Sequence, residues 1–556
     1  MKRQLRKAST AMLCALALLL AIGSALPALA ADAPKPDPSG ANTGGIADVI
    51  GASAGAPTDN DVKTMAEKEP LAAKVADAVG HNRIAINTMW TLLCGFLVMF
   101  MQAGFAMAET GFTRAKNAGH TMAMNFMVYA LGMLGYWAIG FAIQMGGAGP
   151  IATLGGAGVL DSEFTVKLFG KDFGLFGTKG FFLSGMTYDA VVFTIFLFQM
   201  VFMDTTATIP TGAMAERWNF KSFVIYALFV GAVIYPLYAN WVWGGGWLAK
   251  LGSNFGLGHG HVDFAGSSVV HLTGGVISLA GAMILGPRLG KFNKDGTPNA
   301  MPGHHIPMAI VGCFILAFGW FGFNAGSTLS GTDLRIGVVA TNTMLASAAA
   351  AFSSMLYMWL RYGKPDISMS ANGLLAGLVA ITAPCAFVSS VSAVIIGLVA
   401  GVLVCLSVFF VERRLKLDDP VGAISVHGTN GAWGVLALGL FADGTYGDGW
   451  NGVPGTVKGL LYGDASQLAA QAAGTVTNVV FIFALSYAFF KVLDLTMGLR
   501  VDKDKELEGL DQHEVAVTAY PDFNIRALPH RTPAGQPMAM AAEQPVTARE
   551  VAHEKN

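Results

Sequence analysis

Two stretches of this chain match each other: DFAGSSVVHLTGG, from Asp263 to Gly275, and DPVGAISVHGTNG, from Asp419 to Gly431. Aligned without gaps, they are identical at six of thirteen positions, and in each a histidine follows the aspartate by eight residues. Each stretch opens a long apolar segment. Because an ionisable side chain is costly in such surroundings, its repetition indicates an internal duplication built around a site.

The composition places these stretches in a membrane. The chain is 53% hydrophobic and 13% charged, with a mean hydropathy of +0.52, whereas about 25% of a soluble domain is charged. Apolar runs of about 20 residues follow one another, which predicts an all-α polytopic membrane protein. Eleven spans are expected, at 85–110, 118–145, 187–214, 220–248, 262–286, 304–326, 335–360, 368–385, 389–411, 421–442 and 468–497. The net charge of −1, without a Lys/Arg-rich run, gives no sign of nucleic-acid binding.

Residues 1–30 are predicted to be a cleaved signal peptide. An apolar run over 12–22 lies between a basic start and a small-residue cleavage site at 28–30. The alternative is an uncleaved first span. Cleavage would place the mature start outside the cytoplasmic membrane of a bacterium.

The remaining segments are predicted as connections. Residues 31–84 form a periplasmic linker with one short helix near 62–79, and 146–186 form a long Gly-rich loop. Residues 499–556 form a cytoplasmic tail with a disordered end. The five cysteines stand singly, without CxxC spacing, and therefore indicate neither a disulfide framework nor a metal site, and no cofactor is expected.

Basic residues in the loops predict the orientation. The loops from odd to even spans carry twelve of them, and these loops are short: Arg114, Lys116, Arg217, Lys221, Arg288, Lys291, Lys294, Arg361, Lys364, Arg413, Arg414 and Lys416. The other loops hold about half as many, and 443–467 is acidic. The first set is therefore cytoplasmic, with the N-terminus outside and the C-terminus inside.

This orientation makes the duplication an inverted repeat of spans 1–5 and 6–10, because the two stretches start on opposite sides. Eight helical residues rise about 12 Å in a hydrocarbon core of about 30 Å. His271, descending from outside, and His427, ascending from inside, are therefore expected to meet near the midplane. Inverted repeats of this kind commonly form transporter sites at their interface.

The histidines and the aspartates receive different interpretations. A single buried histidine could merely bond a carbonyl between helices, but two at matched positions favour a pore role, in which each imidazole offers a donor and an acceptor. Asp419 precedes Pro420, which is typical of an N-cap followed by proline at the first helical position. Asp263 is also expected to cap a helix, and because it opens on the outside, where a cation would arrive, a role in supporting a site is the alternative interpretation.

Residues 85–525 resemble the ammonium transporter (Amt/Mep/Rh) family, bacterial Amt type. The matching motifs are DFAGSSVVHLTGGVISLAGAMILGPR at 263–288, GFTRAKN at 111–117, GAMAER at 212–217, WGGG at 243–246, GWFGFNAGS at 319–327, DDPVGAISVHG at 418–428 and GLRV at 498–501. The resemblance implies that 85–498 form the transporter domain, that the protein is a homotrimer with one pore per subunit in the bacterial inner membrane, and that it is not an enzyme.

The resemblance also implies roles for individual residues. His271 and His427 match the paired pore histidines, with Trp320 and, more weakly, Thr382 as pore-lining residues. Trp243, Ser327 and Phe202 match the outer ammonium recruitment site, supported by Asp263, and Phe202 and Phe323 match the stacked gate. Asp204, two residues after Phe202, departs from the family pattern.

The expected function is uptake of ammonium, which is deprotonated near the gate and crosses as ammonia, with or without its proton. One alternative is an ammonium sensor that signals through its tail, although the 57 residues after Leu499 leave no room for the signalling domain of known sensors. Another is a Rh-like channel for neutral gases, against which the outer Trp and Ser argue. The tail at 500–523 resembles the segment that helps a PII-type signal protein to block the pores.

Overall fold

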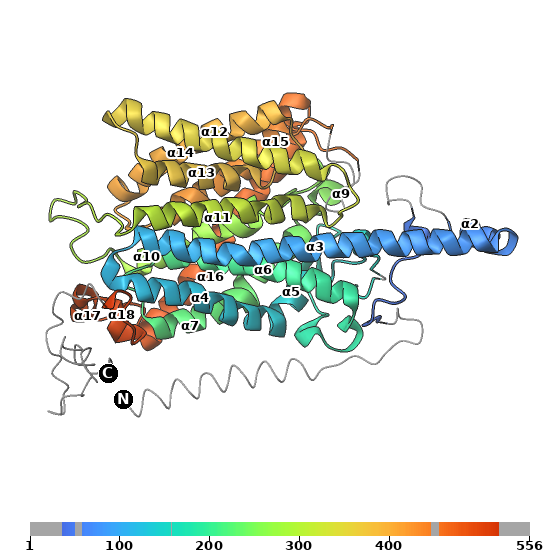
Figure 1. Ribbon diagram of the computed structural model, residues 1–556, viewed down its shortest axis with the longest axis horizontal. Coiled ribbons are helices and arrows are strands. Elements are labelled where there is room, and N and C mark those ends of the chain that lie inside the picture. The colour runs from blue at the N-terminus through green and yellow to red at the C-terminus, as the bar shows by residue number, and fades with distance from the viewer. Residues whose placement is uncertain (1–35, 50–57, 157, 446–454, 522–556) are drawn as a thin grey trace, which may run out of the picture.

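The computed structural model describes residues 36–49, 58–156, 158–445 and 455–521. The predicted signal peptide at 1–30 and the end of the predicted tail lie outside these described residues. Within them the chain forms a bundle of long, roughly parallel helices (Figure 1).

Nine helical segments of the described chain are long and apolar enough to cross a membrane. They are α3 (Pro70–Phe112), α4 with η3 and α5 (Ala118–Gly135, Tyr136–Gly140, Phe141–Met145), α6 (Ala190–Ala213), α7 with η7 and α8 (Phe220–Phe229, Val230–Ile234, Tyr235–Trp243), η8 with α10 (Ser267–Leu272, Thr273–Leu285), α11 with η9 (Ile306–Asn324, Ala325–Thr328), α12 (Ile336–Tyr362), α14 (Ser390–Arg413) and α16 (Ala465–Met497).

Two shorter apolar segments, α13 (Ile367–Ile381) and η10 with α15 (Ile424–Thr429, Asn430–Phe441), correspond to the other two predicted spans. Each predicted span thus has a helical counterpart, and the protein is a multi-pass helical membrane protein. The count of eleven crossings and the orientation stay predictions.

The first long helix starts earlier than predicted. The 43 residues of α3 begin at Pro70, and α2 (Asp59–Lys68) precedes it, so the second half of the predicted linker is helical and projects beyond the bundle (Figure 1). Local sequence explains this. Thr58 and Asp61 form a capping box at the start of α2, and Pro70 takes the first helical position of α3.

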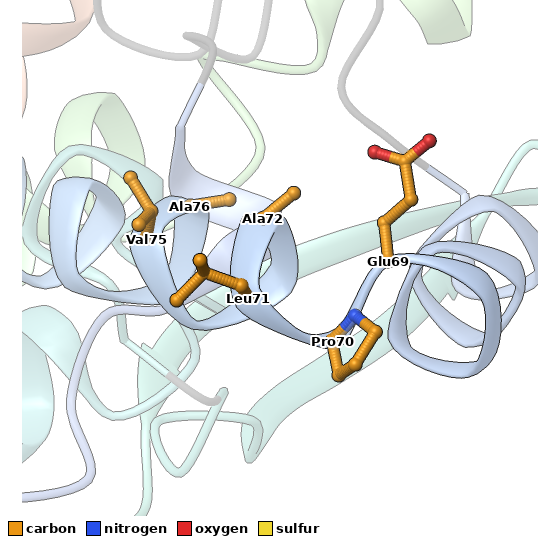
Figure 2. Close-up of a pocket in the computed structure, with 6 residues that line it drawn as sticks. All are labelled: Glu69, Pro70, Leu71, Ala72, Val75 and Ala76. Atoms are coloured by element: carbon orange, nitrogen blue, oxygen red, sulfur yellow. The ribbon is translucent and has the colours of Figure 1, made fainter.

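A hollow lies at the junction of these two helices, on the projecting extension and away from the bundle (Figure 2). It is lined by Glu69, Pro70, Leu71, Ala72, Val75 and Ala76. Leu71 is 76% exposed there. The hollow is therefore separate from the histidine-bearing segments.

The predicted Gly-rich loop contains an antiparallel hairpin, β1 (Glu163–Leu168) and β2 (Lys171–Gly177), which corrects the prediction of a loop throughout 146–186. Phe169 and Gly170, between the strands, both have positive φ, at 54° and 74°. This conformation matches the twist of a two-residue hairpin turn. The sequence gives only a weak strand signal here, because Gly174 interrupts the alternation of apolar and polar residues in β2.

The two repeat stretches have the same backbone design. In each, the histidine lies on a π-helical segment, η8 or η10, and the glycine shortly before it has positive φ, 117° at Gly266 and 81° at Gly422. Helical structure begins at Ser267 in the first stretch and at Ala423 in the second. The expectation that all eight residues from aspartate to histidine are helical is therefore wrong, since the first half of them forms a turn at the glycine.

Buried ion pairs join the loops at the end of the bundle opposite the α2 extension. The Arg288 guanidinium bonds both oxygens of Asp418, at 2.8 and 2.9 Å, and Glu216 at 2.6 Å. Arg114 also bonds Glu216, and the Arg217 guanidinium donates to the Asp418 carbonyl. Because all but Arg114 are buried, charge pairing fixes these loops relative to one another.

The start of the predicted tail packs against the same end of the bundle. It forms α17 (Lys503–Glu508) and α18 (Leu510–Glu514) (Figure 1). Asp511 accepts the backbone N–H groups of Gly119 and His120, at 3.0 and 2.8 Å. Glu506 accepts that of Leu289 at 2.7 Å. The tail thereby ties the start of α4 to the loop after α10.

Candidate functional site

His271 and His427 lie in direct contact, as expected from their matched positions in the two repeat stretches. Their Nδ1 atoms are 3.2 Å apart, and their rings are nearly stacked, with centroids 5.3 Å apart. One Nδ1 must therefore carry the hydrogen that the other accepts. Both rings are buried, and within the described chain Nε2 of His271 has no hydrogen-bond partner. That nitrogen can bond a small polar solute.

Aromatic rings continue from this pair toward the start of the first repeat stretch. Phe323 stacks near His271 with centroids 5.4 Å apart, and Phe202 stacks on Phe323 at 4.1 Å. Trp243 meets Phe202 edge to face at 6.0 Å. The structure thus brings these five predicted residues into one continuous file of rings.

The other predicted residues flank this file. Trp320 stacks on His271 at 5.1 Å, and its indole N–H donates to the Thr382 hydroxyl at 2.9 Å. Ser327 lies one helical turn after Phe323 and donates to the Phe323 carbonyl at 2.8 Å. The indole N–H of Trp243 donates to the backbone carbonyl of Asp263 at 2.7 Å, which fixes the edge of the outermost ring.

Both aspartates accept free N–H groups at a helix start. Asp263 accepts backbone N–H groups from Gly266, Ser267, Ser268 and Val269 and the hydroxyl of Ser268, all at 2.7–2.9 Å. Asp419 accepts N–H groups from Gly422 and Ile424 at 2.9 and 2.7 Å. Capping is confirmed for both. Pro420, however, lies in the bend before the helix and not at its first position.

Phe105 is a neighbour of the site that sequence reasoning missed. Its ring lies 6.1 Å from that of His427 and extends the file on the far side of the histidine pair. Nothing in its sequence context distinguishes it from the other apolar residues of α3. Phe105 also lies far from both histidine motifs in the sequence, so no sequence pattern connects it with them.

Asp204, the departure noted in the sequence, is buried on α6, and its Oδ1 has no partner within the described chain. Two helical residues turn a side chain by about 200°, so Asp204 faces away from the side on which Phe202 stacks. No group of three or more His, Cys, Asp or Glu side chains able to hold a metal ion occurs among the described residues.

The chain matches known proteins over the region that holds this site. Residues 89–520 match the family model described as Ammonium Transporter Family. Ammonium transporter Amt2 of Archaeoglobus fulgidus is 47% identical over 451 residues, which cover 81% of this chain and 91% of that protein.

Solved structures agree with the sequence match. The structure of a protein named Sensor Amt Protein is 36% identical, with a TM-score of 0.67 over 78% of this chain and 99% of that one. Mep2 of Saccharomyces cerevisiae is 26% identical, with a TM-score of 0.62 over 76% of this chain and 88% of that one. With its contacting histidine pair, its two matched repeat stretches and a family match that spans most of its length, this chain belongs to the ammonium transporter family.

Proposed function

We propose that this member of the family takes up ammonium through the file of rings, from an outer recruitment site at Trp243 to the histidine pair. The carrying observation is the contact between the Nδ1 atoms of His271 and His427, 3.2 Å apart, which continues the line of rings from Trp243, Phe202 and Phe323. Two imidazoles in line with stacked aromatic rings suit a small hydrogen-bonding solute. They do not suit a hard metal cation, which prefers oxygen ligands.

Recruitment is assigned to the half-buried indole of Trp243, together with Ser327 and Phe202. An aromatic face attracts a small cation by about 0.5–2 kcal/mol, and the Ser327 hydroxyl can accept an N–H bond from ammonium while it donates to the Phe323 carbonyl. Asp263 supports this site by holding both the helix start and, through its carbonyl, the Trp243 ring. The Asp263 side chain thus supports the site by fixing the helix start beside it.

Passage beyond Phe202 requires loss of charge. Phe202 and Phe323 stack at 4.1 Å and are buried, so an intact cation would lose its water without gaining ligands, at a cost of several kcal/mol. In the proposed step one N–H bond of ammonium breaks, its electron pair stays on nitrogen, the proton passes to a water molecule on the outer side of Phe202, and neutral ammonia moves on. Ammonia then donates to the free Nε2 of His271 or accepts from an imidazole N–H.

The test is simultaneous measurement of ammonium flux and current in proteoliposomes containing the full chain. Current with flux means that the proton crosses as well, whereas flux without current means that ammonia crosses alone, and both support the proposal. Absence of flux would overturn it. A neutral-gas channel, the alternative without recruitment, would show uptake that rises with ammonia concentration and does not saturate with ammonium.

The proposed assembly is a homotrimer in the bacterial inner membrane, formed after removal of residues 1–30. Native mass spectrometry should then give three copies, and N-terminal sequencing should begin at Ala31. A monomer, or a chain that begins at Met1, would contradict these two points separately.

The tail is proposed to take part in regulation by a PII-type signal protein. Support comes from its position, since Asp511 contacts the backbone at the start of α4 and Glu506 contacts the backbone of the loop after α10. A PII protein should co-purify with the full chain and block flux. Flux that is unaffected by a saturating amount of PII protein would remove this part of the proposal.

A further inference from the structure

A buried histidine outside the ring file, His261, lies behind Asp263. The segment around it is fastened to α16: Gln467 accepts the His259 N–H and donates to the Gly260 carbonyl, both at 2.9 Å. Gln471 accepts the Val262 N–H at 2.8 Å and donates to its carbonyl at 2.6 Å. His261 therefore has a fixed backbone on both sides.

The hydrogen bonds around His261 determine which ring nitrogen carries the hydrogen. Nε2 of His261 lies 3.0 Å from the Ser268 hydroxyl and 3.4 Å from the Tyr238 hydroxyl. Ser268 donates its only hydrogen to Asp263 at 2.7 Å, and Tyr238 donates to the Gly474 carbonyl at 3.2 Å. Since neither hydroxyl has a hydrogen left, Nε2 must be the donor to Ser268.

The other side of the ring is closed by helix backbone. A Cβ atom on Gly474 would lie 2.0 Å from Nδ1 of His261, so only glycine lets α16 approach this closely. Nδ1 makes no hydrogen bond of normal geometry within the described chain, although the nearby Ala470 backbone favours the charged ring. Burial lowers the pKa of His261 to about 4, although the charge of Asp263 opposes this shift. The imidazole is thus neutral near pH 7, with its hydrogen on Nε2.

We propose that His261 is a positioning residue for the ammonium site, acting through Ser268 on Asp263. By donating to the Ser268 oxygen, His261 directs the Ser268 hydrogen to Oδ2 of Asp263. That bond helps to hold the side chain of Asp263, and the backbone carbonyl of the same residue accepts the indole N–H of Trp243. The inference rests on the proposed function, because its effect is expected at the recruitment step.

The second repeat stretch provides a natural control for this arrangement. Counting along the aligned repeat, Leu417 takes the place of His261, and Ile424 takes the place of Ser268. The arm of two polar side chains therefore exists only in the first stretch. The variant His261→Leu gives the first stretch the residue that the second already carries.

The experiment compares four variants of the full chain in proteoliposomes: His261→Leu, His261→Gln, Ser268→Ala and the double variant His261→Leu/Ser268→Ala. The half-saturation concentration for ammonium should rise about tenfold in His261→Leu, which corresponds to about 1.4 kcal/mol, with less change in maximal flux. Ser268→Ala should show a similar rise. His261→Gln, whose amide can donate from nearly the same place, should restore a value near that of the natural chain.

The double variant separates positioning from packing. If His261 acts through Ser268, His261→Leu should add nothing once the hydroxyl is gone. If the leucine variant is not recovered folded, His261→Asn replaces it, because its shorter amide cannot reach Ser268 and should raise half-saturation equally.

Two outcomes overturn the inference while leaving the proposed function intact. In one, the natural chain transports and His261→Leu or His261→Asn has an unchanged half-saturation concentration. In the other, the effects of His261→Leu and Ser268→Ala multiply in the double variant, which assigns His261 to packing alone. Absence of flux in the natural chain would instead contradict the proposed function itself.

Discussion

The two repeat stretches share a backbone but are anchored by different chemistry. Both place a histidine on a π-helical segment after a glycine of positive φ. In the first stretch Asp263 accepts five hydrogen bonds, two of them from the backbone N–H and the hydroxyl of Ser268, whose hydroxyl also contacts His261. In the second, Asp419 accepts two.

The second stretch is instead anchored by its neighbouring residue. Asp418 pairs with Arg288, which also bonds Glu216, and this ion-pair network continues toward the tail. The first stretch has no acidic residue at the matching position, because Val262 takes the place of Asp418 in the aligned repeat. The difference shows that duplication kept the geometry that brings the histidines together, while each end acquired its own support.

The largest effect is expected from Arg288→Leu, which breaks the network of the second stretch. It leaves Glu216 and Asp418 buried without their shared partner, and loss of one member of a buried ion pair costs about 3–5 kcal/mol. Unfolding of the purified chain in detergent should show this loss. The control is Arg335→Leu, which removes a partly exposed pair with Asp333 and should cost about 1 kcal/mol or less. Equal losses would contradict a special role for the network.

The caps are compared by Asp263→Ala and Asp419→Ala. At about 1 kcal/mol for each hydrogen bond, the four backbone N–H groups left by Asp263 predict a loss of about 4 kcal/mol. The two left by Asp419 predict about 2 kcal/mol. The free energy of unfolding in detergent measures both. A larger loss at Asp419 would reverse the comparison.

Alanine at either matched glycine, Gly266 or Gly422, should destabilise the chain, but to different extents. An alanine at either position is forced into positive φ, at about 1–2 kcal/mol. At Gly266 the added Cβ would also lie 2.7 Å from the Val270 side chain and 3.2 Å from the Trp243 ring, whereas at Gly422 the nearest atom is the Asn372 amide at 3.0 Å. Gly266→Ala should therefore be the more destabilising in thermal unfolding.

A position on a regular helix provides the control for these glycines. Gly337 lies in α12, and a Cβ there meets no atom within 4 Å. Gly337→Ala should not destabilise the chain. A loss at Gly337 as large as that at Gly422 would show that backbone conformation is not the cause.

The smallest effect is expected from moderate acid. The guanidinium groups of Arg217 and Arg288 hold the pKa of Asp418 well below its usual value of 3.8, against the opposing effect of burial. A lowered folded-state pKa means that the stabilisation is fully present above the unfolded pKa and is lost as pH falls through the folded one. The gap in melting temperature between the natural chain and Asp418→Asn should therefore stay constant from pH 7 to 5. A gap that closes within this range would contradict the assignment.

Much of this architecture could be predicted because it depends on long apolar segments. The eleven predicted spans have helical counterparts, and the contact between His271 and His427 was expected from their matched places in two stretches predicted to form an inverted repeat. The stacking of Phe202 on Phe323 was predicted only through the family resemblance, since two phenylalanines in apolar helices carry no signal of their own.

The rest depended on contacts that no local pattern contains. His261 meets Ser268 and α16 because Gln467 and Gln471, about 200 residues later, dock its backbone. The helix starts at Ser267 because the Asp263 carboxylate caps it from four residues ahead, across the turn at Gly266. Neither the turn nor the distant amides could be inferred from the motif alone.

The central claim is that the paired histidines form the conducting centre, and it is tested most directly by ammonium flux and current in proteoliposomes with the natural chain and with His271→Ala/His427→Ala. The account predicts saturable flux in the natural chain and a double variant whose ammonia flux, current or selectivity against larger cations differs clearly from it. Transport by the double variant that matches the natural chain in rate, current and selectivity would contradict the account.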